Sequence, residues 1–258
     1  MRRLLLSLFV AGWLATPILN FASAYPEPNV EIAPTGKLRA AMIGIRVLGG
    51  VGEPIGRFIA TRIGVSFESV VYPNPQAYEQ SFGKDEWDIA IGPRVLAPAD
   101  KANLTPDVWL IDLLYLAAPG RDFTSADEVD HSGVKVGTIE NSPSDRFLTR
   151  TLKSADLVRI PLTSHFPTDA VQLLSSGKAD VFGADSGLID SIVDSLPEAQ
   201  IVPGAFNTVR AAVALPKRRP IEAFDKLVEI VTEAKRTGVV AKAIEQSGLR
   251  NGVRVAPE

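Results

Sequence analysis

The stretch IENSPSDRFL, residues 139–148, places several hydrogen-bonding side chains where a strand is expected to end and a helix to begin. Ser142 suits the N-cap, Pro143 suits the first helical turn, and Asp145 completes an acidic variant of the capping box. A helix start also attracts anions, because its free N–H groups carry partial positive charge. Two interpretations stay open: a plain helix cap, or a ligand site in which the Ser144 hydroxyl takes part. Asp145 opposes an anion there if its carboxylate folds back over the helix end.

Two arginines are candidates for holding an acid group. Arg94 follows Gly92 and Pro93 at a predicted strand end, where a guanidinium could grip a carboxylate or phosphonate with two hydrogen bonds. Arg46, which is expected to end the first strand in GIRVLGG, could add a second positive contact. The alternative for both is a surface arginine or an ordinary ion pair.

Asp185, which closes the strand motif FGAD, either faces a ligand or caps the following helix. Tyr72 and Tyr78 flank the segment PNPQA and either stack on a ligand or pack in the protein interior. These residues complete the predicted ligand-binding set: Arg46, Tyr72, Gly92, Arg94, Asn141, Ser142, Ser144 and Asp185.

Other chemistries have weak support. Gly50, Gly52 and Gly56 outline a dinucleotide fingerprint, but the expected acidic residue after the next strand is missing, so a flexible ligand loop is the better interpretation. His131 and His165 lie in separate segments without a second ligand at helical spacing, so no metal is expected. No nucleophile motif is present. We therefore expect no cofactor and no enzymatic activity.

The order of predicted elements is β-α-β-α-β, and it occurs twice. Each half is expected to form a mostly parallel sheet covered by helices, an α/β architecture. The first half has strands at 37–44, 65–72 and 87–92 with helices at 54–64 and 75–83; the second has strands at 134–139, 157–162 and 180–185 with helices at 143–155 and 167–177.

A sequence repeat accompanies this order. FGKDEWDIAIG and SGKADVFGAD each place Gly-Lys at a helix end, then an acidic residue, then a buried strand. Two similar lobes are therefore expected. The segments 108–120 and 208–216 would carry the chain between them as hinge strands, and helices at 221–248 would complete the first lobe. The predicted division is 25–117 with 207–258 for the first lobe, and 118–206 for the second.

The N-terminal segment has the features of a secretory leader. Arg2 and Arg3 precede an apolar run that ends in the small residues Ala22-Ser23-Ala24, which predicts a cleaved signal peptide at 1–24 and a periplasmic location. The remaining chain has 25 basic and 30 acidic residues, a net charge of −5 that disfavours nucleic acid and anionic membranes as partners. With 0 Cys, no disulfide or lipid-modified thiol is available. A monomer without direct membrane insertion is expected.

Several motifs together resemble a known family. The segments TGKLRAAM, EWDIAIG, GVKVGTIENSPSDRFL, SGKADVFGAD and TGVVAKAIEQSGLRNGVRVAP are similar to those of periplasmic solute-binding proteins of ABC importers, of the type II fold and the family that includes polar amino-acid binders. The resemblance implies a two-lobed protein that closes on a small-molecule solute and delivers it to an inner-membrane permease.

The resemblance also implies roles for individual residues. Asn141, Ser142 and Ser144 correspond to the helix start that relatives use for a carboxylate, and Asp185 to their amine-binding aspartate. The usual arginine clamp is missing, since Asp100 stands near its place. An acidic or zwitterionic solute is expected, held by Arg94 and the helix start, whereas ordinary α-amino acids should bind poorly.

Two alternatives remain. A few relatives are dehydratases, and such an enzyme would need a general acid for which Glu53 or Glu140 is available. The chain could also be a binding subunit for a sensor or a periplasmic dehydrogenase.

Overall fold

The computed structural model describes residues 31–163 and 165–257. The predicted signal peptide therefore lies outside the described residues. No helix within the described ranges is both long enough and apolar enough to span a bilayer.

The first lobe is built on parallel strands. β1 pairs with β2 on one side, from Lys37 opposite Ser66 to Ile43 opposite Tyr72, and with β3 on the other. Helices at the end of the chain return to this lobe and pack against α2. Its elements are β1 (Lys37–Ile43), the π-helical turn η1 (Arg46–Gly50), α2 (Val51–Ile63), β2 (Ser66–Tyr72), α3 (Pro75–Gln80), β3 (Ile89–Pro93), the 3-10 turn η2 (Arg94–Leu96), β4 (Ala102–Leu104), α7 (Ile221–Arg236), α8 (Val239–Gln246) and β11 (Val253–Val255).

The second lobe repeats the arrangement. β6 is flanked by β7 and β8, and both pairings are parallel. Its elements are the 3-10 turn η3 (Ala126–Val129), β6 (Lys135–Ile139), α4 (Pro143–Thr151), β7 (Asp156–Ile160), α5 (Thr168–Ser175), β8 (Val181–Asp185), α6 (Ser186–Val193) and β9 (Gln200–Ile201).

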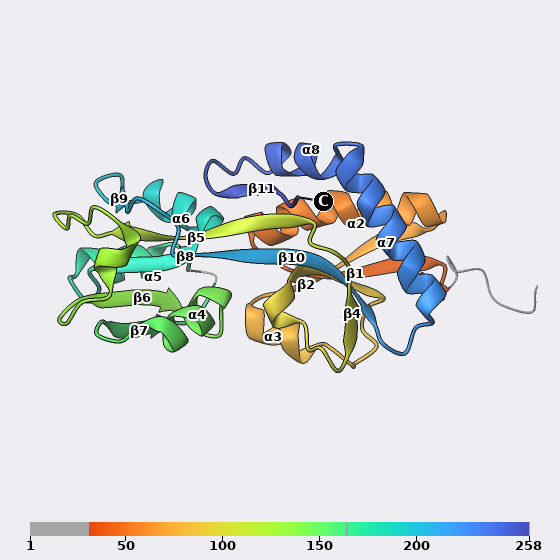
Figure 1. The fold of residues 1–258 in the computed structure, drawn as a ribbon, viewed down its shortest axis with the longest axis horizontal. Helices are drawn as coiled ribbons and strands as arrows, with labels where there is room; N and C mark the ends of the chain where they lie inside the picture. The colour runs from red at the N-terminus through yellow and green to blue at the C-terminus, as the bar shows by residue number, and fades with distance from the viewer. Residues whose placement is uncertain (1–30, 164, 258) are drawn as a thin grey trace, which may run out of the picture.

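Two long strands, β5 (Trp109–Ala117) and β10 (Asn207–Pro216), connect the lobes, which lie side by side along the long axis of the molecule (Figure 1). The first half of β5 pairs with β10 and β11, and its second half pairs with β8 and β9. The sheet is therefore continuous through both lobes, in the order β2-β1-β3-β10-β5-β8-β6-β7. The predicted α/β two-lobed fold is confirmed.

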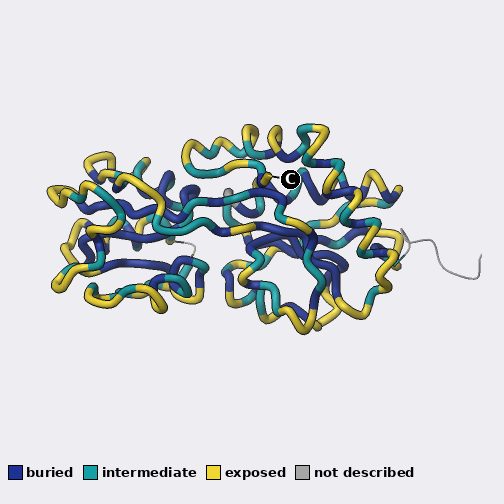
Figure 2. Tube along the Cα trace, viewed as in Figure 1, coloured by how far each residue is buried: buried dark blue, intermediate teal, exposed yellow. Residues whose placement is uncertain are grey.

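The hydrophobic cores are separate. One large cluster of buried residues fills the first lobe, and two smaller clusters fill the second, on the two faces of its sheet. The central strands β1, β3, β5, β8 and β10 are dark along most of their length in Figure 2, whereas loops and outer helix faces are exposed. Each lobe thus has its own core, which is what a hinge between rigid bodies requires.

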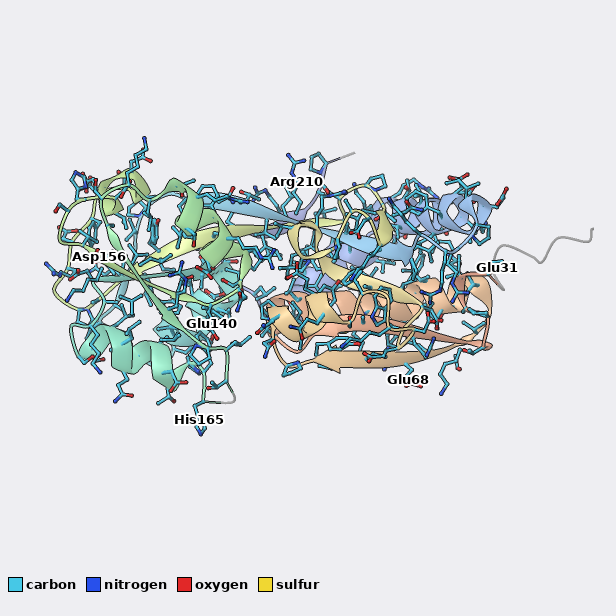
Figure 3. The ribbon with its side chains drawn as sticks, turned by 90° about the horizontal axis from the view of Figure 1, so that it is seen from below. Glu31, Glu68, Glu140, Asp156, His165 and Arg210 are labelled. Atoms are coloured by element: carbon cyan, nitrogen blue, oxygen red, sulfur yellow. The ribbon has the colours of Figure 1, made fainter. Side chains whose placement is uncertain are left out.

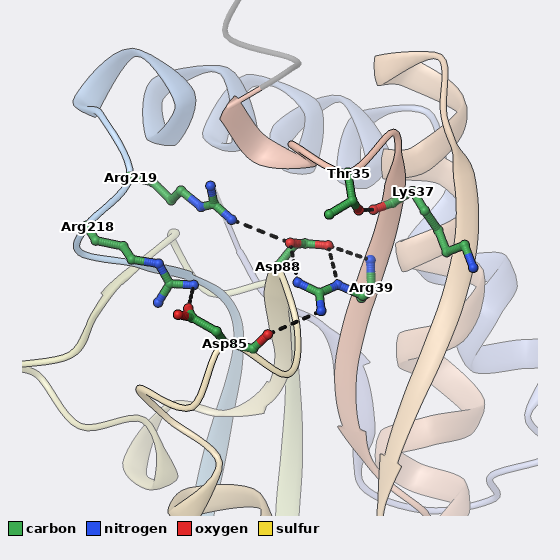
Figure 4. Close-up of polar contacts among 7 residues, drawn as sticks. All are labelled: Thr35, Lys37, Arg39, Asp85, Asp88, Arg218 and Arg219. Atoms are coloured by element: carbon green, nitrogen blue, oxygen red, sulfur yellow. Dashed lines mark hydrogen bonds and ion pairs between the residues drawn. The ribbon is translucent and has the colours of Figure 1, made fainter.

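The sequence repeat has a structural counterpart at the end of each sheet where the strands begin. The buried carboxylate of Asp88 accepts the backbone N–H of Arg39 at 3.0 Å, and that of Asp180 accepts the backbone N–H of Lys135 at 2.8 Å. In each lobe, the acidic residue before the third strand therefore secures the first strand. Figure 4 shows that Arg39 and Arg219 both reach Asp88 in the first lobe.

The glycine-rich segment 49–56 differs from the expected flexible loop. The predicted helix at 54–64 begins earlier, at Val51, and is preceded directly by η1. A Cβ atom at Gly56 would lie 2.5 Å from the Phe67 ring, and one at Gly52 would lie 3.3 Å from Ile91. These two glycines allow α2 to approach the sheet closely, so their role is packing.

Candidate functional site

A cavity opens between the lobes beside the crossing strands. Its empty space is about 430 Å³, including the part open to solvent. Figure 3 shows Glu140, at the end of β6, on the side of the second lobe that faces the first. All but three of the lining residues are apolar: Ile43, Ile45, Leu48, Pro75, Pro93, Ile111, Leu113, Ile139, Ser142, Pro143, Ser144, Leu162, Asp185, Leu188 and Val209.

The start of α4 supplies two of the three polar residues. Ser142 is the N-cap, and its Oγ accepts the backbone N–H of Asp145 at 3.1 Å. The same Oγ lies 2.8 Å from the Ser144 Oγ, which also receives a longer contact from Thr138. Ser142 therefore caps the helix and lines the cavity at once, so the two interpretations of this stretch are compatible.

Thr138 is a supporting residue that sequence reasoning missed. It is fully buried in β6, donates to the backbone oxygen of Gly183 at 2.8 Å, and lies 3.3 Å from the Ser144 Oγ. The only signal in the sequence was one hydroxyl residue within an otherwise apolar strand.

Asp145 provides the second half of the capping box, because its side chain accepts a backbone N–H that precedes the helix. One carboxylate oxygen accepts the backbone N–H of Asn141 at 2.8 Å, and the other accepts from Arg159 at 2.8 Å and Thr149 at 3.1 Å. The carboxylate therefore folds back over the helix end. Asn141 itself is exposed, with a left-handed φ of 60°, and does not line the cavity.

Asp185 is the third polar residue of the cavity and its one described charged side chain. It caps α6 by accepting the backbone N–H of Leu188 at 3.0 Å. Burial raises the pKa of Asp185 to about 6, while hydrogen bonds from the backbone N–H groups of Leu188 and Gly187 act in the opposite direction. Within the described ranges no basic side chain forms an ion pair with it.

The structure does not bring Arg94 to the cavity. Its Nε donates to Asp107 at 2.9 Å, and its second terminal nitrogen donates to the backbone oxygen of Thr105 at 2.6 Å. The neighbouring Pro93 lines the cavity instead. Arg94 thus has the ion pair that was its alternative interpretation, and contact with a ligand stays a prediction.

The other predicted residues lie apart from the cavity or outside the described side chains. Gly92 is buried against Tyr78, whose hydroxyl would lie 3.0 Å from a Cβ atom there. Tyr72 donates to Glu86 at 2.6 Å and meets Tyr78 edge-on. The backbone of Arg46 begins η1 instead of ending β1, and its side chain lies outside the described part of the structure.

The carboxylates considered for catalysis also lie elsewhere. Glu53 pairs with Arg57 on the surface of α2, and Glu140 is exposed. His165 lies on the outer edge of the second lobe in Figure 3. Among the described residues, no group of three or more His, Cys, Asp or Glu side chains could hold a metal ion.

Among the described residues, two groups of polar contacts cross between the lobes. Arg146 of α4 forms an ion pair with Glu79 of α3. On the other side, Arg250 and Asn251, just before β11, bind Asp190 of α6: the Arg250 backbone N–H donates at 3.0 Å and the Asn251 side chain at 2.7 Å. The lobes are therefore in contact across the cavity.

Comparisons with known proteins agree with this architecture. No family model matches the chain, and neither does any curated protein. Among solved structures, a mutant of ArgBP from T. maritima has a TM-score of 0.68 at 16% identity, covering 87% of this chain and 100% of that one. AbpA of Streptococcus pneumoniae, an amino acid ABC transporter substrate-binding protein bound to L-arginine, has a TM-score of 0.68 at 17% identity, with 85% and 99% covered.

A third structure is an ancestral amino acid-binding protein described as a precursor of cyclohexadienyl dehydratase. Its TM-score is 0.67 at 17% identity, with 87% of this chain and 100% of that chain covered. At these identities the likeness shows the fold. The chain has the two-lobed type II fold of substrate-binding proteins of amino-acid ABC transporters, as the sequence resemblance implied.

Proposed function

We propose that this protein is a solute-binding protein that captures a small organic molecule in the cavity between its lobes and presents it to an ABC permease. The cavity carries this proposal, because both lobes and both crossing strands contribute to its wall. A ligand that contacts both lobes favours the closed arrangement, which is how such a protein would signal occupancy to a partner.

The chemistry of the wall supports binding more than catalysis. Glu53 and Glu140 do not line the cavity, so Asp185 is the one described carboxylate that could act as a general acid there. The ancestral neighbour named for its link to a dehydratase keeps the enzymatic alternative open on this fold. A catalytic role would have to use Asp185 and would appear as turnover of a prephenate-like acid.

A thermal-shift screen tests the proposal. Amino acids, amines, dicarboxylates, phosphonates and osmolytes are each added in excess to the folded protein. A true ligand at 100 times its dissociation constant adds about 2.7 kcal/mol to the free energy of unfolding. Binding without turnover supports the proposal, whereas product formation in the same mixture would favour the dehydratase alternative.

The partner is tested separately. A permease reconstituted from the same gene neighbourhood should take up the ligand only in the presence of this protein. Stimulation of a sensor kinase or a periplasmic dehydrogenase, without uptake, would assign the chain to those partners instead.

A further inference from the structure

The aliphatic part of the cavity wall indicates what the body of the solute consists of, provided that the cavity is the binding site as proposed. The polar lining residues Ser142, Ser144 and Asp185 all belong to the second lobe, at the start of α4 and the end of β8. The lining residues described in β1, in η1 and in both crossing strands are aliphatic. The wall therefore has a mixed side and an aliphatic side.

Three aliphatic side chains of the wall keep part of their surface uncovered. Ile45, directly before η1, is only partly buried, and so are Leu162 and Leu188 of the second lobe. If these residues served only to pack one lobe against the other, the opposite lobe would cover them, as Leu48 is covered at 4% exposure. A hydrocarbon group binds favourably to such a surface, because the gain in free energy grows with the apolar area removed from water.

The uncovered aliphatic surface lies at the boundary between the lobes. η1 of the first lobe lies against α6 of the second. Ile45 and Leu48 come from one side of this boundary, and Leu188 comes from the other. A hydrocarbon group placed here contacts both lobes at once, so its burial favours the closed arrangement.

We infer that the solute carries a short aliphatic chain, and that this chain binds where η1 meets α6, between Ile45 and Leu188. The hydrocarbon part then contributes most of the selectivity among solutes that share a polar end. The class includes compounds with a branched or linear chain of a few carbon atoms, in contrast to solutes of the same shape whose chain ends in an amide.

Matched pairs that exchange an isopropyl group for a carboxamide test this inference. The probes are leucine against asparagine, 4-methylpentanoate against succinamate, and isoamylamine against β-alaninamide, each titrated into the purified protein by calorimetry. Members of a pair share their charged groups, so the comparison concerns the chain alone. In the pair whose polar end fits, we expect the aliphatic member to have a dissociation constant at least about tenfold lower. Its binding should also have the more negative heat-capacity change.

A variant of the wall tests the assigned contact. Ile45→Ala removes most of the uncovered side chain and should reduce the preference for the aliphatic member by about fivefold or more. Ile244→Ala is the matched control, because Ile244 is also partly buried against the core of the first lobe but does not line the cavity. It should leave the preference unchanged. Leu188→Ala repeats the test from the second lobe.

Three results would overturn the inference. If the amide member of each pair binds as tightly as its aliphatic partner, the solute-binding function stands and the aliphatic class fails. The same holds if none of the six probes binds at millimolar concentration while another compound of the screen stabilises the protein; if no compound at all does so, the proposed function fails as well. A preference that survives both Ile45→Ala and Leu188→Ala would reject the place assigned to the chain.

Discussion

Two features of the surroundings of Asp185 act in opposite directions on its charge. It caps α6, which favours the charged form, but it lies beside an apolar cavity, which raises its pKa to about 6. The charge of Asp190 acts in the same direction as burial. Because the unfolded pKa is about 3.9, the folded state holds more protons between about pH 4 and 6.

The ligand-free protein should therefore lose some stability through Asp185 as pH rises from about 4 to about 6, with no further loss above that range. Asp185→Asn should remove this contribution, so the variant gains stability relative to the wild type across this interval. Denaturant titrations of both proteins at about pH 4 and about pH 7 measure the difference in their free energies of unfolding. If the two free energies of unfolding differ by the same amount at both pH values, the pKa of Asp185 is not raised in the folded protein.

Arg94 is a second residue for which the structure shows partners within the protein. Its ion pair with Asp107 is about one-third exposed, at 36% for the arginine side chain. Arg94→Ala should therefore lower the free energy of unfolding by about 1 kcal/mol or less, and it should leave ligand affinity unchanged. Calorimetry with the ligand from the screen checks this. Loss of binding would reinstate Arg94 as the anion clamp that its position after β3 suggested.

At the scale of elements, the carboxylates that precede the third strand of each lobe hold the sheets together. Asp88 is fully buried and receives three hydrogen bonds from Arg39, one of them from the backbone N–H. Arg219 adds a fourth at 3.4 Å. The start of β1 thus depends on a charge at the start of β3.

Asp88→Asn should lower the free energy of unfolding by roughly 3 kcal/mol or more, because it leaves two arginines without their buried counter-charge. The matched control is Asp85→Asn. Asp85 also pairs with an arginine, Arg218, but its side chain is 71% exposed, so a change below about 1 kcal/mol is expected. Equal effects of the two variants in chemical denaturation would show that the buried network is not a stabilising feature.

At the scale of the whole molecule, the contact between Glu79 and Arg146 joins the lobes without belonging to the cavity. Both side chains are about one-third exposed. A pair of this kind contributes up to about 1 kcal/mol, which changes the ratio of closed to open molecules by up to about fivefold. The pair should therefore adjust the conformational equilibrium without determining ligand identity.

Glu79→Gln should increase the radius of gyration of the ligand-free protein in small-angle scattering, and saturating ligand should restore the wild-type value. The charge-exchanged protein, Glu79→Arg with Arg146→Glu, should recover the closed population because the pair is re-formed. If the radius of gyration is the same with and without ligand in all of these proteins, the strands β5 and β10 do not act as a hinge.

Local patterns in the chain were sufficient to predict the two βαβαβ units, their repeat and the two-lobed α/β fold. Apolar periodicity predicts which segments are buried, and it depends on residues only a few positions apart. The capping of α4 by Ser142 is equally local, so a single sequence carries both kinds of information. The same holds for Asp185, whose place between a strand and a helix made it a candidate.

The composition of the cavity wall depended on contacts between distant segments. Arg94 follows a strand end just as a ligand-binding arginine would, but the chain brings Asp107 beside it, and no local pattern predicts that pairing. Glu79 and Arg146 meet only because β5 and β10 set the two lobes face to face. The strand order places Asp185 among apolar residues of both lobes. These surroundings, which the identity of the residue alone does not reveal, raise its pKa and determine which groups of a solute could contact it.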